Sequence, residues 1–169
     1  LDNAQPAYIG NQNGDAKAAI AGAAKKIEAV YNYPYQNHVC MEPMNATALY
    51  TSDKCEVWCG TQNGEAAFAA AMEASGLPAE KCEVHKHILG GGFGRRGMTD
   101  YVRQAVAIAK QMPGTPVKLL WSREEDMAQG KFHPVTQCKL TGAFDADNNL
   151  TALHVRLSGQ SILFSVRPA

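Results

Sequence analysis

A glycine-rich stretch, ILGGGFGRRG at residues 88–97, constrains the fold of this chain more than any other segment. It overlaps the end of an alternating run, KCEVHKHIL, that is typical of a β-strand, and it precedes the helical pattern TDYVRQAVAIAKQM. Gly92, Gly94 and Gly97 complete a G-x-G-x-x-G pattern between the two elements. The sequence therefore predicts a strand, a loop and a helix in succession, with a loop whose main chain can approach a ligand closely.

A dinucleotide-binding (Rossmann) site that uses residues 92–97 to hold NAD(P) is one interpretation, because that site requires the same succession of elements. Two features count against it. A parallel strand buried on both faces should be almost wholly apolar, yet four of the five residues at 83–87 are charged or histidine. The expected helix cap is Thr99 or Asp100, so the glycines precede the helix instead of entering it.

A connector without a ligand is a second interpretation, since glycine-rich turns often join a strand to a helix. Four glycines among residues 90–94 are more than a turn needs, because each adds conformational entropy to the unfolded chain. Arg95 and Arg96 add an affinity for anions that a plain connector does not require. A third interpretation, a loop that faces a bound cofactor, depends on other segments of the chain.

Periodicity and turn residues predict the other elements: a short helix capped by Asp15, a strand from residue 26, a hairpin within 46–60, a helix within 63–77, a short buried strand at 116–121 and a hairpin after His133. Strands and helices alternate irregularly, which predicts an α+β fold with a mixed sheet and two or three helices. We expect residues 1–169 to form a single domain. Because the chain begins with Leu1, we also expect it to be a fragment of a longer polypeptide.

Composition and hydropathy argue against two classes of protein, nucleic-acid-binding proteins and membrane-spanning proteins. Sixteen basic residues balance sixteen acidic ones, and such a balance does not favour a nucleic-acid-binding protein, which must neutralise many phosphates. No apolar run approaches the roughly 20 residues that span a bilayer, so no membrane span is expected. The five cysteines are odd in number, and Cys55 and Cys59 would lie about 13 Å apart on a strand, too far for a disulfide, which favours free thiols.

Four segments join the glycine loop in a recognisable order: HVCMEPMNATA at 38–48, VWCGTQNGEAA at 57–67, VKLLWSREEDM at 117–127 and GKFHP at 130–134. In this order and spacing they resemble the molybdenum-binding subunit of the xanthine oxidase family of hydroxylases, on the branch of isoquinoline 1-oxidoreductase and the bacterial aldehyde oxidoreductases. The resemblance runs from about residue 14 onward and covers only part of such a subunit.

The resemblance implies a set of cofactor-binding residues. In that family a glycine-phenylalanine-glycine loop lies against the molybdopterin cofactor, and Gly91, Gly92, Phe93 and Gly94 match it. The family's T-Q-N segment matches residues 61–63, which implies that the Gln62 amide donates a hydrogen bond to an oxygen ligand of molybdenum. An ordinary polar role for Gln62 at a helix start stays open.

The flanking positions carry further expectations. At least one of Arg95 and Arg96 is expected to bind the cofactor's pyrophosphate, with Arg95 our choice, while the other pairs with Asp100 or water. Gly97 stands where xanthine-type members have a glutamate, and Phe132 stands where they have an arginine. The implied substrate pocket is therefore more apolar and suits an aromatic N-heterocycle or an aldehyde.

The resemblance also implies the chemistry. It is oxidative hydroxylation with water as the oxygen source, on molybdopterin cytosine dinucleotide, with electrons leaving through 2Fe-2S clusters of a separate small subunit. The family's catalytic glutamate lies near the end of the whole subunit and has no match here, so we expect no catalytic residue in this chain and no activity from it alone. Relatives occur in bacterial cytoplasm and periplasm, and the sequence does not decide the compartment.

Three other groups of polar residues have simpler interpretations than a catalytic or metal-binding site. Glu42, before Pro43, is expected to make structural hydrogen bonds rather than to act as an acid. Cys82, His85 and His87 could suggest a metal site, but a strand directs Cys82 to the face opposite the histidines. The charged residues at 123–126 are expected to form a solvated turn or helix start.

Overall fold

The computed structural model describes residues 5–163, and residues 1–4 and 164–169 lie outside the described part. The chain divides into two compact units. One is continuous, residues 37–132, and the other combines the residues up to 36 with those from 133 onward. The chain passes between them in two short strands that pair with each other, β2 (Gln36–Asn37) and β7 (Phe132–His133).

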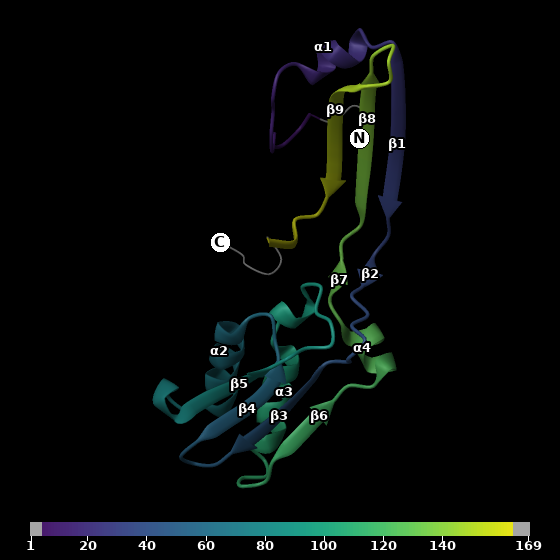
Figure 1. Ribbon diagram of the computed structural model, residues 1–169. Coiled ribbons are helices and arrows are strands. Elements are labelled where there is room, and N and C mark those ends of the chain that lie inside the picture. Colours follow the sequence, from purple (N-terminus) through teal and green to yellow (C-terminus); the bar gives the residue numbers. More distant parts are fainter. Residues whose placement is uncertain (1–4, 164–169) are drawn as a thin grey trace. The chain divides into compact units, whose positions relative to one another are not determined.

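The continuous unit is a four-stranded mixed sheet in the order β5-β4-β3-β6 (Figure 1). Its strands are β3 (Asn45–Tyr50), β4 (Cys55–Gly60), β5 (Cys82–His87) and β6 (Val117–Leu120). β3 is antiparallel to both β4 and β6, whereas β4 and β5 are parallel. The parallel pair is joined by α2 (Gly64–Ser75) and a short 3-10 helix, Ala79–Lys81, as a parallel connection requires.

Helices α2 and α3 (Asp100–Ala109) cover one face of this sheet (Figure 1). Alternate residues of β4, namely Cys55, Val57 and Cys59, are buried beneath them. The helices meet the sheet largely through alanine, because its small side chain allows close approach. The predicted apolar face of α3 is confirmed, since Val102, Ala105, Val106 and Ala109 are all buried.

The second unit is a three-stranded antiparallel sheet in the order β1-β8-β9, with β1 (Lys25–Tyr33), β8 (Thr136–Phe144) and β9 (Leu150–Gly159). Helix α1 (Ala16–Ala21) precedes it, and the Asp15 side chain caps the helix by accepting from the Ala18 N–H at 2.9 Å. At the β8–β9 turn, Asn148 has a φ of 65°, as the predicted turn residues allow.

The predicted α+β class is confirmed, with four α-helices among the described residues instead of two or three. The additional one is α4 (Arg123–Gln129), whose cap is Ser122. The prediction of a buried strand at 116–121 is wrong in one respect: β6 is the sheet edge, so its residues alternate in burial and Leu120 is 62% exposed. No described helix has the length and apolarity to cross a membrane.

Candidate functional site

The glycine loop follows the edge strand β5 and leads through a 3-10 helix, Arg95–Gly97, to α3. Three of its residues have left-handed backbone: Gly91 (φ 97°), Phe93 (φ 51°) and Gly94 (φ 98°). Glycine adopts this region freely, but phenylalanine does so at a cost. The loop therefore holds Phe93 in an unfavourable conformation with its ring 68% exposed.

Two glycines are required because side chains of the same chain lie against them. A Cβ atom at Gly92 would lie 2.4 Å from Oε1 of Gln62, and one at Gly90 would lie 2.6 Å from Cβ of Glu42. The sequence interpretation attributed the bare backbone to close approach by a ligand. At these two positions the close approach is made by Gln62 and Glu42.

Gln62 follows β4 and precedes α2, and it is bound to the glycine loop at both its main chain and its side chain. Its N–H donates to the Arg96 carbonyl at 3.1 Å, and its Oε1 accepts from the Gly94 N–H at 2.9 Å. Since only Oε1 can accept from an N–H, this bond fixes the orientation of the amide. The exposed Nε2 donates to no described residue, so it is a fixed donor that is available to a ligand.

The main chain of the loop offers further donors beside Gln62. Among the described residues, nothing accepts a hydrogen bond from the N–H groups of Gly91, Gly92 or Phe93. The next N–H groups are used within the chain, for example that of Arg95, which donates to the Gly92 carbonyl at 2.8 Å. Successive unpaired N–H groups in such a turn form a concave anion-binding surface.

Arg96 lies beneath the loop and is fully buried. Its Nε donates to the Gly91 carbonyl at 2.8 Å and one terminal nitrogen donates to the Glu42 carbonyl at 2.6 Å. The same nitrogen is 3.2 Å from the Glu42 carboxylate. The Arg96 carbonyl also accepts from the Thr61 hydroxyl at 3.1 Å. A guanidinium can make these bonds in several directions at once, so Arg96 joins the loop to β4 and to the segment before β3.

Glu42 supports the loop from the other side, as the sequence interpretation expected. Its carboxylate accepts from the Gly90 N–H at 2.6 Å and from the Asn45 amide at 2.7 Å. Burial raises the pKa of this carboxyl, but the bonds from Asn45 and Gly90 and the charge of Arg96 outweigh it, so the pKa is lowered from its usual 4.5. Glu42 is therefore ionised and structural.

Arg95 points away from the exposed side of the loop. It is 2% exposed, and its terminal nitrogens bind both carboxylate oxygens of Asp100 at 2.8 and 2.7 Å. The guanidinium carbon lies 5.5 Å from the centre of the Trp121 ring. Pyrophosphate binding by Arg95 would require the pair with Asp100 to open, and it remains a prediction.

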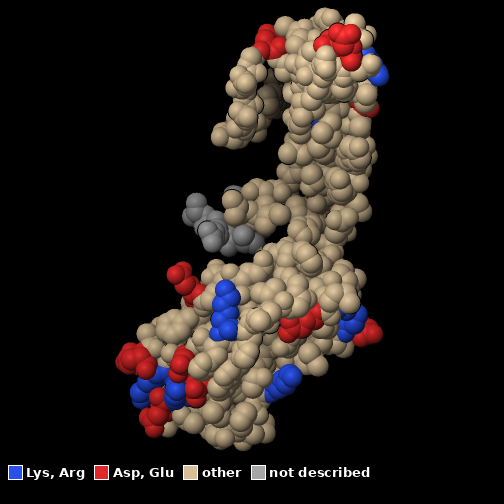
Figure 2. All heavy atoms as spheres, in the orientation of Figure 1, with Lys and Arg blue, Asp and Glu red and all other residues tan. Residues whose placement is uncertain are grey.

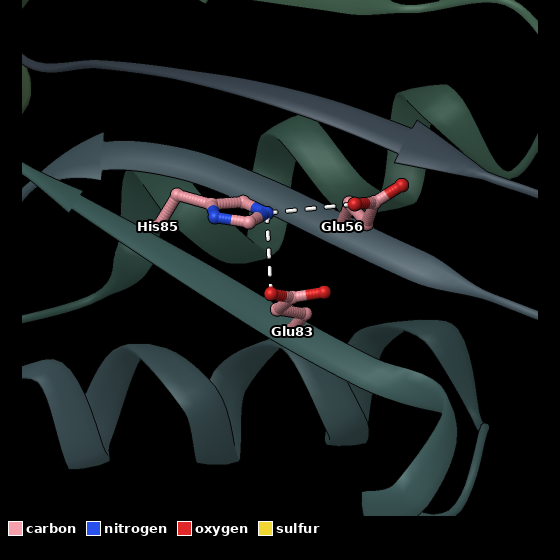
Figure 3. Close-up of side chains that lie close together, drawn as sticks. All are labelled: Glu56, Glu83 and His85. Atoms are coloured by element: carbon pink, nitrogen blue, oxygen red, sulfur yellow. Dashed lines mark hydrogen bonds and ion pairs between the residues drawn. The ribbon is translucent and has the colours of Figure 1, made fainter.

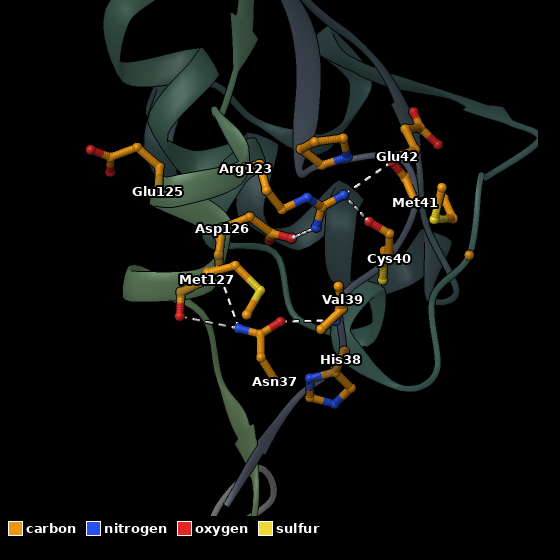
Figure 4. A network of polar contacts seen from close by, with 12 residues as sticks. Asn37, His38, Val39, Cys40, Met41, Glu42, Arg123, Glu125, Asp126 and Met127 are labelled. Carbon is orange, nitrogen blue, oxygen red and sulfur yellow. Dashed lines mark hydrogen bonds and ion pairs between the residues drawn. The ribbon is translucent and has the colours of Figure 1, made fainter.

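A polar network holds the segment at residues 37–42 against α4 (Figure 4). The Asn37 amide donates to the Asp126 carbonyl at 3.0 Å and accepts from the Val39 N–H at 2.8 Å. Arg123 donates to the Met41 carbonyl at 3.0 Å and to the Asp126 carboxylate at 3.0 Å. The same segment reaches the glycine loop, because the Glu42 N–H donates to the Gly90 carbonyl at 3.1 Å.

The expectation that residues 123–126 are solvated is wrong for Asp126, which is 2% exposed. An arginine three residues before an aspartate on a helix was the sequence signal for this pair. The charged run at 123–126 thus contains both buried and exposed residues, since Glu124 and Glu125 are exposed. Only the packing of α4 against residues 37–42 distinguishes the buried Asp126 from the two exposed glutamates.

The predicted substrate-pocket residues lie at separate places. Phe132 is in β7 and 45% exposed, and Gly97 ends the 3-10 helix with nothing within 4 Å of where its Cβ would be. His38 connects the two regions. Its Nδ1 lies 3.0 Å from the Lys131 carbonyl, and its Nε2 would be 3.9 Å from a Cβ at Gly94.

A second group of ionisable residues lies on the sheet face opposite the helices (Figure 3). Nε2 of His85 is 3.4 Å from Glu56 and 3.7 Å from Glu83, and its ring stacks on Trp58 at 4.9 Å. Lys54 already binds both carboxylates at 2.9 and 3.0 Å. The group is thus an ion-pair network between β4 and β5 in which Lys54 already occupies both carboxylates.

Cys82 faces the opposite way from this network. Its sulfur lies 3.6 Å from the Ser75 hydroxyl of α2, whereas His85 lies with the two carboxylates on the other face. Cys82 and His85 therefore do not share a metal site, as the strand geometry predicted.

Comparison with known proteins agrees with this geometry. Residues 2–161 match the molybdopterin cofactor-binding domain, and the chain belongs to that family. The resemblance to the molybdenum hydroxylases of the xanthine oxidase family is confirmed. The isoquinoline 1-oxidoreductase beta subunit of Brevundimonas diminuta is 33% identical over 132 residues, 76% of this chain and 16% of that protein. The molybdenum-binding subunit of an Escherichia coli aldehyde oxidoreductase is 28% identical over 86% of this chain and 20% of its own length.

A third relative carries a different cofactor in its name. A membrane-bound aldehyde dehydrogenase of Gluconacetobacter polyoxogenes, described with pyrroloquinoline quinone, is 31% identical over 86% of this chain and 19% of its own length. Among solved structures, the aldehyde oxidoreductase of Desulfovibrio gigas superposes with a TM-score of 0.67 at 19% identity, over 86% of this chain and 16% of that one. This chain therefore spans less than a quarter of these relatives.

The Rossmann interpretation is wrong. β5 is an edge strand, and the strand that follows α3, β6, lies at the opposite edge of the sheet instead of beside β5. A dinucleotide fold would place the two strands in adjacent parallel positions or across a switch point. The last glycine of the pattern, Gly97, ends a 3-10 helix before α3 and does not enter it.

Proposed function

We propose that this chain is the part of a molybdenum hydroxylase large subunit that lines one side of the molybdenum cofactor. The observation that carries the proposal is the fixed amide of Gln62. Gly94 holds its oxygen, so its Nε2 faces outward beside the unpaired N–H groups of residues 91–93. Donors held in advance bind the oxygen atoms of a ligand with little loss of entropy.

The residues fit an oxygen-rich cofactor. When bound, such a cofactor takes two electrons from the substrate while water supplies the oxygen. Gln62 would donate to an oxygen on the metal, and the N–H groups of Gly91 and Phe93, which are not buried, would donate to further oxygens of the cofactor. Phe93 would exclude water beside them, which accounts for an exposed ring held in a strained conformation.

The finer parts of the proposal rest on the sequence resemblance. The cofactor would be molybdopterin cytosine dinucleotide, with Arg95 near its pyrophosphate. The electrons would leave through 2Fe-2S clusters on a separate small subunit. The catalytic base would come from the remainder of the large subunit.

The proposed substrate is an aromatic N-heterocycle or an aldehyde. Gly97 adds no side chain to its surroundings and Phe132 adds an exposed ring, so neither offers a charged contact to a purine. Comparing a quinoline or isoquinoline, an aromatic aldehyde and xanthine with the intact enzyme tests this. Xanthine turnover at the rate of the best substrate would refute it.

The cofactor is tested on the full-length large subunit, co-produced with its small partner. We expect molybdenum and a pterin in equal amounts, and cytidine 5′-monophosphate after acid hydrolysis of the pyrophosphate. Gln62→Ala should lower kcat about 10- to 100-fold, the loss of one hydrogen bond to a charged group, and Gln111→Ala should not. An active preparation without molybdenum or pterin, or with pyrroloquinoline quinone instead, would overturn the proposal.

A further inference from the structure

The sheet β1-β8-β9 has one polar face and one apolar face, and the apolar face is the exposed one. Register places Tyr31, Cys138 and Leu157 in one row across the three strands, and Ala29, Leu140 and Val155 in the next. Ile27 and Leu153 extend the same face. Tyr31 is 50% exposed and Leu157 is 68% exposed.

The opposite face carries the charges. Its rows join Glu28, Thr141 and His154, and then Val30, Lys139 and Arg156. A pocket on this face is lined by these polar side chains together with Lys17 and Ile20, so α1 lies on the polar side. Figure 2 shows one side of these strands almost without charge, and the charged side chains visible on this unit lie near the end that carries α1.

This arrangement is the reverse of the usual one. A two-sided antiparallel sheet normally buries its apolar face and leaves its polar face in water. A contiguous apolar face that remains exposed identifies a surface for association. A sheet of only three strands relies on its hydrophobic face for stability.

We propose that the apolar face of β1, β8 and β9 packs permanently against an apolar surface of the remaining large-subunit polypeptide. The curated relatives are about five to six times as long as the part this chain matches, since it spans 16% to 20% of them. An uncharged face also favours an obligate contact within one chain, because subunits that separate expose more polar interfaces. The inference rests on the proposed function for the existence of that polypeptide.

The test uses single cysteines in the full-length subunit assembled with its partner. Leu157→Cys lies on the apolar face and Ser158→Cys, its matched control, lies on the polar face of the same strand. Both side chains are exposed in the described chain. We expect maleimide to modify Leu157→Cys at least about tenfold more slowly than Ser158→Cys, with equal rates in urea. Equal rates in the native subunit would overturn the proposal.

A photo-crosslinker attached at Leu157→Cys identifies what covers the face. The expected product joins residue 157 to a peptide of the same large subunit at all protein concentrations. A crosslink to the small subunit or to a second copy would overturn the proposal. Val155→Cys repeats the measurement if Leu157→Cys does not assemble.

Failure of this inference is separable from failure of the proposed function. Molybdenum and pterin are measured in the same preparations. A cofactor-loaded subunit that labels rapidly at residue 157 refutes only the packing surface. A protected residue 157 in a subunit without molybdenum refutes only the proposed function.

Discussion

The side-chain oxygen of Gln62 accepts a 2.9 Å hydrogen bond from the main-chain N–H of Gly94. A residue from the β4–α2 connection therefore sets the position of a loop that follows β5. The loop in turn fixes which atom of the Gln62 amide is outward. Each of the two segments is arranged by the other, and the predictions below test this mutual dependence.

Gly92→Ala should disrupt the site by steric overlap alone, because Gly92 is not among the glycines with a positive φ. The added Cβ would lie 2.4 Å from Oε1 of Gln62, so the amide must move and lose its bond to Gly94. We expect a loss of about 0.5–1.5 kcal/mol in stability, the contribution of one hydrogen bond, seen as a lower thermal midpoint of the full-length subunit. Gly64→Ala is the control, because nothing lies within 4 Å of its Cβ and a helical glycine is replaced.

Arg96→Lys should be strongly destabilising although it keeps the charge. A lysine cannot bind the carbonyls of Gly91 and Glu42 and the Glu42 carboxylate together. We expect a loss of about 1.5–3 kcal/mol, the contribution of hydrogen bonds that a charged group donates. Arg103→Lys, in an exposed pair with Glu73, should cost less than about 1 kcal/mol. Equal urea midpoints for the two variants would contradict this account.

Stability should fall in acid through Glu42. The pKa of its carboxyl is lowered in the folded protein, so its contribution is present above the unfolded value near 4.5 and is lost as pH falls through the folded pKa. Glu42→Gln lacks this titration. The difference in urea midpoint between wild type and Glu42→Gln should therefore shrink between pH 6 and pH 3, by about the effect of one ionised group. A constant difference would show that Glu42 does not titrate with folding.

Asp126→Ala should weaken α4 and the segment it supports. The substitution leaves Arg123 without its 3.0 Å partner while that guanidinium still donates to Met41. We expect a loss of about 1–3 kcal/mol, because Arg123 loses a charged hydrogen-bond partner but is itself only partly buried, and faster hydrogen exchange at residues 37–42. Glu125→Ala, one position earlier and exposed, should change neither quantity.

Cys59 should resist alkylation in the folded subunit. Burial raises the pKa of its thiol to about 11, and the same holds for Cys55. Iodoacetamide at pH 8 should modify both only after urea is added. Modification of either residue in native protein at the rate of a free thiol would contradict the buried position of β4.

The local elements were predictable because each is determined by its own residues. Asp15 caps α1, Gly76 ends α2 with a φ of 75°, and alternation predicted β8 and β9. The sheet order was not predictable, since β5 and β6 are distant in the sheet although only one α-helix, α3, lies between them in sequence. The sequence suggested Asp100 as a partner for one of the two arginines, but no local pattern showed that both arginines are buried or that Arg96 pairs with Glu42.

Because the Gln62 side chain lies against Gly92, the residues allowed at these two positions depend on each other. A side chain at position 92 can be accommodated only if residue 62 is small or turned away, so the two positions are expected to change together across relatives. Replacing Gln62 by a smaller residue would therefore free position 92 to accept a side chain. Directed evolution should therefore randomise both codons in the same library.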